Sequence, residues 1–175
     1  MSDYQNLTEQ LLDSGSAPLP SESVIIEGYV KALHQQAIDE AENIQEAKDF
    51  YIDYYTNGPG AAGIKSMISD FKNKYAELKN GIDDLKVSIT QITASNAMPS
   101  VITTGAAASV PNPSHFMIEN AQKKRSVQVQ VRALAGVAAK VLEASDMLCM
   151  GVPSAILTLI YTLITVKKTV ESIPG

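Results

Sequence analysis

Nine apolar residues between positions 64 and 92 recur at gaps that alternate between four and three residues. This spacing is typical of a coiled-coil helix, in which one narrow apolar stripe faces a partner helix. With a rise of about 1.5 Å per residue, a helix over these positions would be about 45 Å long. Such a stripe is stable in water only when another helix covers it. The seam consists of Ile64, Ile68, Phe71, Tyr75, Leu78, Ile82, Leu85, Ile89 and Ile92.

The segment before this seam offers a partner helix from the same chain. Residues 21–56 repeat the spacing of four and three, with Val30, Leu33, Ile44 and Tyr51 among the seam positions. Gly58, Pro59 and Gly60 then end the helix and turn the chain. Because so short a turn joins antiparallel neighbours, we predict a coiled-coil hairpin of helices at about 21–56 and 61–95.

The register of this hairpin predicts one contact between its two arms. Glu40 is the only charged residue at a seam position of the first arm, and folding about Pro59 places it opposite Leu78 and Lys79. We therefore expect an exposed Glu40–Lys79 ion pair that sets the alignment. Such a pair contributes about 0–1 kcal/mol, so its role would be to specify the register rather than to stabilise it.

The rest of the chain divides into an N-terminal arm, a connector and two further helices. Residues 1–20 read as a short helix and a linker, and residues 96–113 as an uncharged extended connector. Helices are expected at about 114–149 and 153–172, so that 114–175 forms a C-terminal packing region. Residues 126–131 alternate between apolar and polar residues, which would indicate a strand in isolation, although the Ala-rich sequence after them favours a helix.

The most apolar part of the chain is 147–166, which carries no charge over 20 residues. That length is sufficient to cross a bilayer, but Gly151 and Pro153 divide it, and the remaining run is short for a span. We interpret it as a buried or oligomer-interface helix, with contact to a membrane as the alternative. The residues of this face are Ile156, Leu157, Leu159, Ile160, Leu163 and Ile164.

No combination of residues indicates catalysis, a cofactor or a metal site. Residues 58–63 match the letters G-x-G-x-x-G, but a helix rather than a strand precedes them, so a turn is the better interpretation. Cys149 could pair with His34 or His115 only in a fold that no motif supports, and we expect a buried structural thiol. The histidines and acidic residues lack metal-ligand spacing. We therefore predict that the protein is not an enzyme.

The net charge of −5 makes nucleic acid an unfavourable partner. The only basic concentration, at 123–125 with Arg132 and Lys140, is interpreted as a complement to the acidic segment 39–53 of a neighbouring subunit. Helices this long cannot all bury their stripes in one chain of 175 residues. We therefore predict an elongated, oligomeric all-α protein that assembles with itself and with other subunits.

The function that best fits these expectations is that of a structural subunit in a large assembly. A small chain that is rich in Ala, Ser and Thr and lacks a site suggests a bacteriophage virion component of the tail, baseplate or neck. Without a signal peptide at its N-terminus, the chain is expected to be made in the cytoplasm. A membrane-active protein, such as a pore-former or ejection component that uses residues 147–166, is the alternative.

Overall fold

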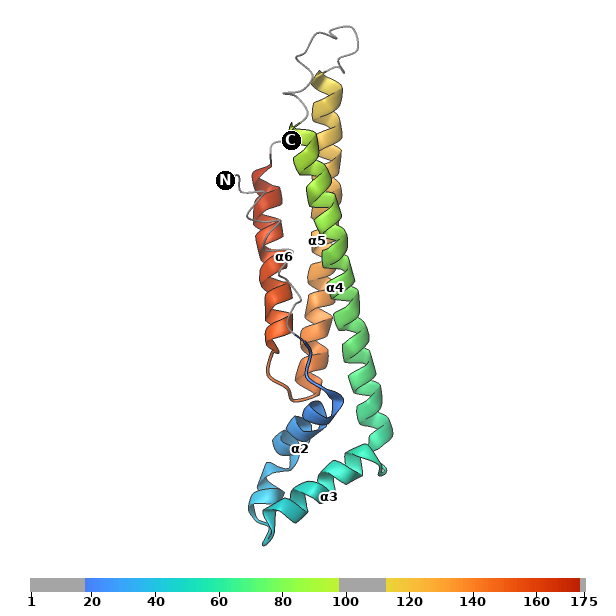
Figure 1. Ribbon diagram of the computed structural model, residues 1–175, viewed down its shortest axis with the longest axis vertical. Coiled ribbons are helices and arrows are strands. Elements are labelled where there is room, and N and C mark those ends of the chain that lie inside the picture. The colour runs from blue at the N-terminus through green and yellow to red at the C-terminus, as the bar shows by residue number, and fades with distance from the viewer. Residues whose placement is uncertain (1–17, 98–112, 174–175) are drawn as a thin grey trace.

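The computed structural model describes residues 18–97 and 113–173. Within these ranges the chain forms five helices and no strand: α2 (Glu22–Asp39), α3 (Ile44–Thr56), α4 (Ala61–Ala97), α5 (Pro113–Met147) and α6 (Ser154–Ser172). Figure 1 shows α4, α5 and α6 side by side with alternating directions, while α2 and α3 form an angled pair at one end. The prediction of an all-α protein is confirmed. The predicted N-terminal helix and most of the predicted connector lie outside the described residues.

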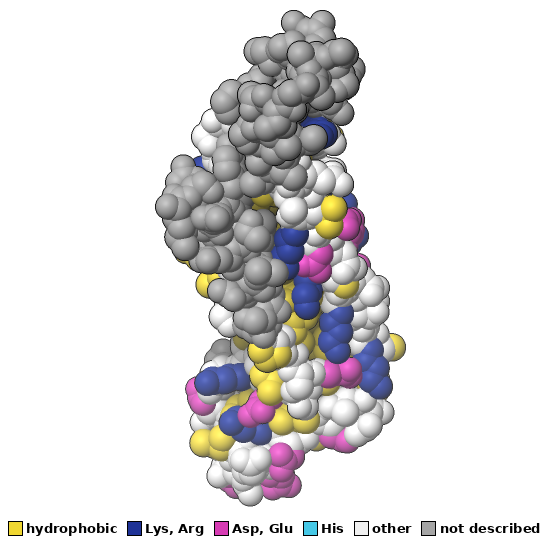
Figure 2. All heavy atoms as spheres, turned by 45° about the horizontal axis from the view of Figure 1, so that its top comes forward, with side chains coloured by type: hydrophobic (Ala, Val, Ile, Leu, Met, Phe, Trp, Pro, Cys, Tyr) yellow, Lys and Arg dark blue, Asp and Glu magenta, His cyan; other side chains and the backbone are white. Residues whose placement is uncertain are grey.

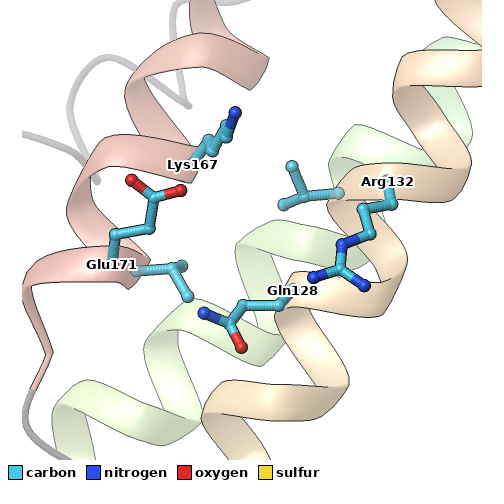
Figure 3. Close-up of a pocket in the computed structure, with 6 residues that line it drawn as sticks. Gln128, Arg132, Lys167 and Glu171 are labelled. Carbon is cyan, nitrogen blue, oxygen red and sulfur yellow. The ribbon is translucent and has the colours of Figure 1, made fainter.

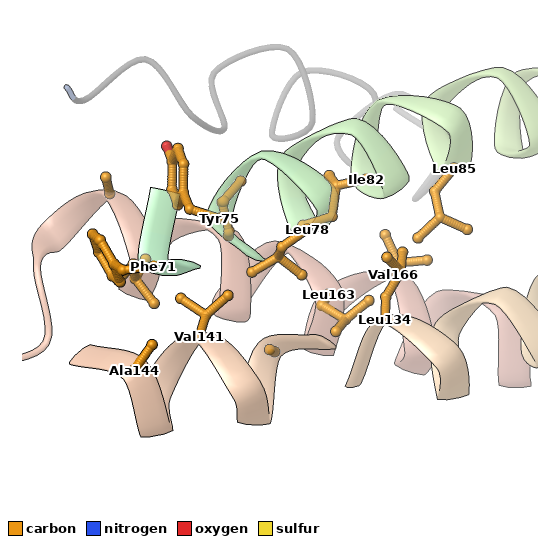
Figure 4. Close-up of a cluster of buried hydrophobic side chains, with 14 of the residues drawn as sticks. Phe71, Tyr75, Leu78, Ile82, Leu85, Leu134, Val141, Ala144, Leu163 and Val166 are labelled. Atoms are coloured by element: carbon orange, nitrogen blue, oxygen red, sulfur yellow. The ribbon is translucent and has the colours of Figure 1, made fainter. Parts of the chain in front are cut away.

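The core lies along α4, where the predicted seam faces the other two long helices. All nine seam residues from Ile64 to Ile92 are buried. The most extensive contact of α4 is with α5, and α6 packs against both. Figure 4 shows Phe71, Leu78 and Leu85 of α4 pointing toward side chains of α5 and α6 such as Val141 and Val166. The spacing of four and three therefore identified the buried face of α4 correctly.

Helix α5 contributes a second seam, and it includes the segment that alternates like a strand. Residues 126–131 are helical. Val127 and Val131 are buried and share one face of the helix, whereas Val129 points outward with 58% of its surface exposed. The helical period thus decides which valines are buried, because positions four apart lie on the same face of a helix. The seam continues through Leu134, Ala138, Val141, Ser145 and Leu148, all buried.

The predicted continuous helix over 21–56 is wrong. The chain breaks between Glu40 and Asn43 into α2 and α3, which pack against each other. Asn43 caps α3: its side chain accepts a hydrogen bond of 3.1 Å from the backbone N–H of Glu46. An Asn followed by a Glu three residues later is a pattern typical of a helix start, although neither Gly nor Pro marks the break.

The predicted pairing of this segment along α4 is corrected as well. The partner that runs along α4 is α5, while α2 and α3 make smaller contacts with it. Glu40 does not pair with Lys79; its carboxylate instead accepts a 3.5 Å hydrogen bond from the amide of Gln36. Of the predicted seam residues in this segment, Val30 is buried, Tyr51 is half-buried, and Leu33 and Ile44 remain exposed. A broken helix cannot offer α4 a continuous stripe, whereas the 35-residue α5 can.

The end of α5 places Cys149 in the left-handed region of the backbone, with φ 56°. The N–H of Met150 bonds to the carbonyl of Ser145 and the N–H of Cys149 to that of Asp146, the two bonds of a Schellman motif. The position that Cys149 occupies in this motif is usually a glycine, because a Cβ atom on a left-handed residue clashes with the backbone. The cysteine is exposed, so the prediction of a buried thiol is wrong.

We expect Cys149→Gly to stabilise the protein by about 1 kcal/mol, because the change removes the Cβ atom from a left-handed residue. The measurement is the free energy of unfolding in urea. Cys149→Ala is the matched control, since it removes the thiol but keeps the Cβ atom. A gain of the same size in the alanine variant would show that the thiol, and not the backbone, is responsible.

Candidate assembly surface

The apolar residues of α6 divide into a face that packs in the core and a face that points outward. Ile156, Leu159 and Leu163 are buried, and Ile160 is half-buried. The predicted oligomer or membrane face is therefore mostly core. What remains outside is a stripe of three residues spaced four and three apart, with 40%, 66% and 43% of their surfaces exposed. We call Leu157, Tyr161 and Ile164 the α6 stripe.

The threonines of α6 bond to their own helix. The hydroxyls of Thr158, Thr162 and Thr165 donate to the backbone carbonyls of residues 154, 158 and 161, at distances of 2.8–2.9 Å. Each hydroxyl therefore has a partner within α6. This arrangement lets polar residues lie within a largely apolar helix without a polar surface opposite them.

A cluster of aromatic residues holds α2 and α3 at their angle. The ring of His34 stacks on Tyr51, with centroids 4.0 Å apart, and lies 2.9 Å from the hydroxyl of Tyr55. Tyr55 also meets the rings of Tyr29 and Tyr54 edge-on. Burial, followed by the neighbouring tyrosines, raises the pKa of Tyr55, so its hydroxyl keeps its proton at neutral pH and serves as a hydrogen-bonding group.

Sequence reasoning missed this cluster because it treated Tyr51 as a seam residue. The available signal was the concentration of Tyr29, Tyr51, Tyr54 and Tyr55 within 27 residues, in a chain that has only seven tyrosines. His34 comes within reach of them only because the chain breaks at residues 40–43. The cluster therefore depends on the corner between the two helices.

The outer side of α3 is the second exposed apolar surface. No residue of α3 is buried. Phe50 and Tyr54, which lie one turn apart, have 65% and 39% of their surfaces exposed. We call these two residues the α3 stripe. Asp49 and Asp53 are also exposed, one residue before each aromatic side chain.

Charge is distributed unevenly between the helical corner and the bundle. Residues 18–57 contain eight acidic residues and two lysines, a net charge of −6, whereas residues 61–173 contain 12 basic and eight acidic residues, a net charge of +4. Figure 2 shows Lys and Arg side chains in a line along the bundle and several Asp and Glu side chains at its lower tip. The two parts of the molecule are therefore electrostatically complementary.

A shallow hollow of about 250 Å³ lies between α5 and α6. Figure 3 shows Gln128 and Arg132 of α5 on one side and Lys167 and Glu171 of α6 on the other, with Val131 and Val170 completing the lining. Glu171 lies in the same hollow as the cations Arg132 and Lys167, so the lining does not have a uniform charge. The hollow also lacks a pair of groups arranged as nucleophile and base.

The other positions that could have carried chemistry do not come together. Residues 58–63 join α3 to α4, and a Cβ atom on Gly60 would lie 2.6 Å from the ring of Tyr54. Cys149 lies at the end of α5, whereas His34 belongs to the aromatic cluster of α2 and α3. The side chain of His115 is outside the described residues. Within the described part of the chain, no three His, Cys, Asp or Glu residues are placed to hold a metal ion.

No protein-family model matches the chain, and no curated protein or solved structure shows significant similarity to it. Among the described residues, no helix combines the length and the apolar character required to span a bilayer.

Proposed function

We propose that this protein is a non-enzymatic structural subunit that assembles with copies of itself and with other subunits. The observation that carries the proposal is the exposure of the aromatic side chains Phe50 and Tyr161 on two helices at different places in the fold. Single exposed apolar residues are common on protein surfaces. Here they form stripes at helical spacing, as expected where a second helix docks.

Within this class, we propose a bacteriophage virion as the assembly. The composition supports this assignment: the chain is small, with abundant Ala, Ser and Thr. The long bundle of α4, α5 and α6 in Figure 1 supports a role in building an extended structure. The residues that would make the assembly contacts are those of the α3 stripe and the α6 stripe. The buried seam of α4 forms the core that supports both helices.

Light scattering after size exclusion, without detergent, tests self-assembly. We expect a mass that is a multiple of 18.8 kDa, and we expect Tyr161→Ser to lower it. Val87→Ser is the matched control, because Val87 is 60% exposed on α4 and belongs to neither stripe. A wild-type protein that remains a monomer at high concentration would contradict the proposal.

The alternative function is that of a membrane-active protein, and the α6 stripe is the observation that favours it. Leu157, Tyr161 and Ile164 could contact lipid as readily as protein, because an apolar helix face binds either. This alternative predicts that the protein stays in solution only with detergent and co-sediments with liposomes. Assembly in detergent-free buffer with no binding to liposomes would exclude it.

A further inference from the structure

We propose that α3 of one copy docks on α6 of a second copy, so that the α3 stripe covers the α6 stripe. This inference rests on the proposed self-assembly and adds which two surfaces meet. Within one chain, the described residues of α3 and α6 make no contact. The two stripes are therefore both available to a neighbouring copy.

The apolar parts of the two surfaces match in kind and extent. Tyr161 and Phe50 have 66% and 65% of their surfaces exposed, the largest fractions among the large apolar side chains described. Each stripe covers one or two helical turns, because Phe50 and Tyr54 are four residues apart and the α6 stripe spans eight residues. Exposed aromatic side chains of this kind are the usual anchors of protein interfaces.

Charge selects the pairing of α3 with α6 over pairing of like surfaces. Asp49 and Asp53 flank the α3 stripe, while Lys167 and Lys168 follow the α6 stripe at the next turn, and all four are exposed. Two α3 helices would bring four carboxylates together, and two α6 helices would bring four lysines together against only two carboxylates, Glu171 of each copy. The mixed contact places two aspartates against two lysines, and such complementarity determines which partners associate.

The pairing of α3 with α6 limits the symmetries that the assembly can adopt. In a two-fold dimer the contact would form twice between the same two copies, and otherwise it is heterologous and links each copy to two neighbours. Such contacts produce a closed ring if the rotation between copies closes, and a filament if it does not.

A charge exchange tests the contact. We expect Asp49→Lys/Asp53→Lys and Lys167→Glu/Lys168→Glu each to lower the mass toward 18.8 kDa, because each variant places like charges at the contact. An equimolar mixture should have a higher mass than either variant alone, since the lysines on α3 of one variant meet the glutamates on α6 of the other. Circular dichroism checks that each variant remains helical.

The matched control is Lys65→Glu/Lys72→Glu, which changes two exposed lysines of α4 by the same charge and should leave the mass unchanged. An oligomeric wild type whose mass is insensitive to the α3 variant would overturn the contact and leave the proposed function standing. A mixture whose mass stays at that of the separate variants would also overturn it. A monomeric wild type would contradict both proposals.

Discussion

Replacing Phe71 with alanine is expected to lower the free energy of unfolding by about 3–5 kcal/mol, because Phe71 is completely buried between α4 and its neighbours. Two contributions make up this loss: the transfer free energy of the buried ring that is removed, and the cost of the cavity left behind. A folded domain is stable by only about 5–15 kcal/mol, so the variant would retain a fraction of its stability. The measurement is urea unfolding followed by circular dichroism.

Phe50→Ala is the matched control for this prediction. It is the same chemical change at a side chain that is 65% exposed, with one edge-on contact to Tyr51. When both variants also carry Lys167→Glu/Lys168→Glu, which removes the proposed contact between α3 and α6, we expect Phe50→Ala to change the free energy of unfolding by less than about 1 kcal/mol, as is usual for surface positions. Equal losses for the two variants in this background would contradict a core centred on α4.

The second large effect is expected at Gly81, in the middle of α4. A Cβ atom at this position would overlap Cδ2 of Leu134 and lie 3.1 Å from its Cγ, so α4 and α5 are in close contact here. Gly81→Ala therefore gains helix propensity but overpacks the interface. Gly136→Ala, on α5, makes the same change where nothing lies within 4 Å of the new atom.

The difference between these two variants isolates the free-energy cost of overpacking the contact between Gly81 and Leu134. Alanine favours a helix interior by about 1 kcal/mol over glycine at both positions, so this contribution cancels in the difference. Gly136→Ala should stabilise the protein, and Gly81→Ala should be about 1–3 kcal/mol less favourable than Gly136→Ala. Equal effects would show that Leu134 moves aside without loss, and that the helices need not approach so closely.

The sequence predicted the interior of the long helices well. In α4 and α5 the pattern of four and three is a local property, because the rotation per residue alone decides which positions share a face. Helix α4 continues unbroken through Asn80 and Gly81, and the seam keeps its phase across them. Only the structure shows the reason for this glycine, which is its contact with Leu134, 53 residues further on.

Prediction of the candidate surface was less complete for a physical reason. The run at 155–166 is apolar on nearly all sides, so periodicity could not separate Ile156 and Leu163, which are buried, from Leu157 and Ile164, which are not. The position of α5 decides which side of α6 enters the core. The outward stripe is therefore defined by tertiary packing.

By itself, the sequence determined that the chain is helical, where α4, α5 and α6 lie, and which faces of α4 and α5 are apolar. The tertiary structure decided which helix covers which. Residues 21–56 and α5 both offered seams of suitable spacing to α4, and helix pairs of similar pattern have similar local energies. The choice depends on continuity: Asn43 caps a new helix and divides the first candidate, whereas α5 presents 35 unbroken residues along α4.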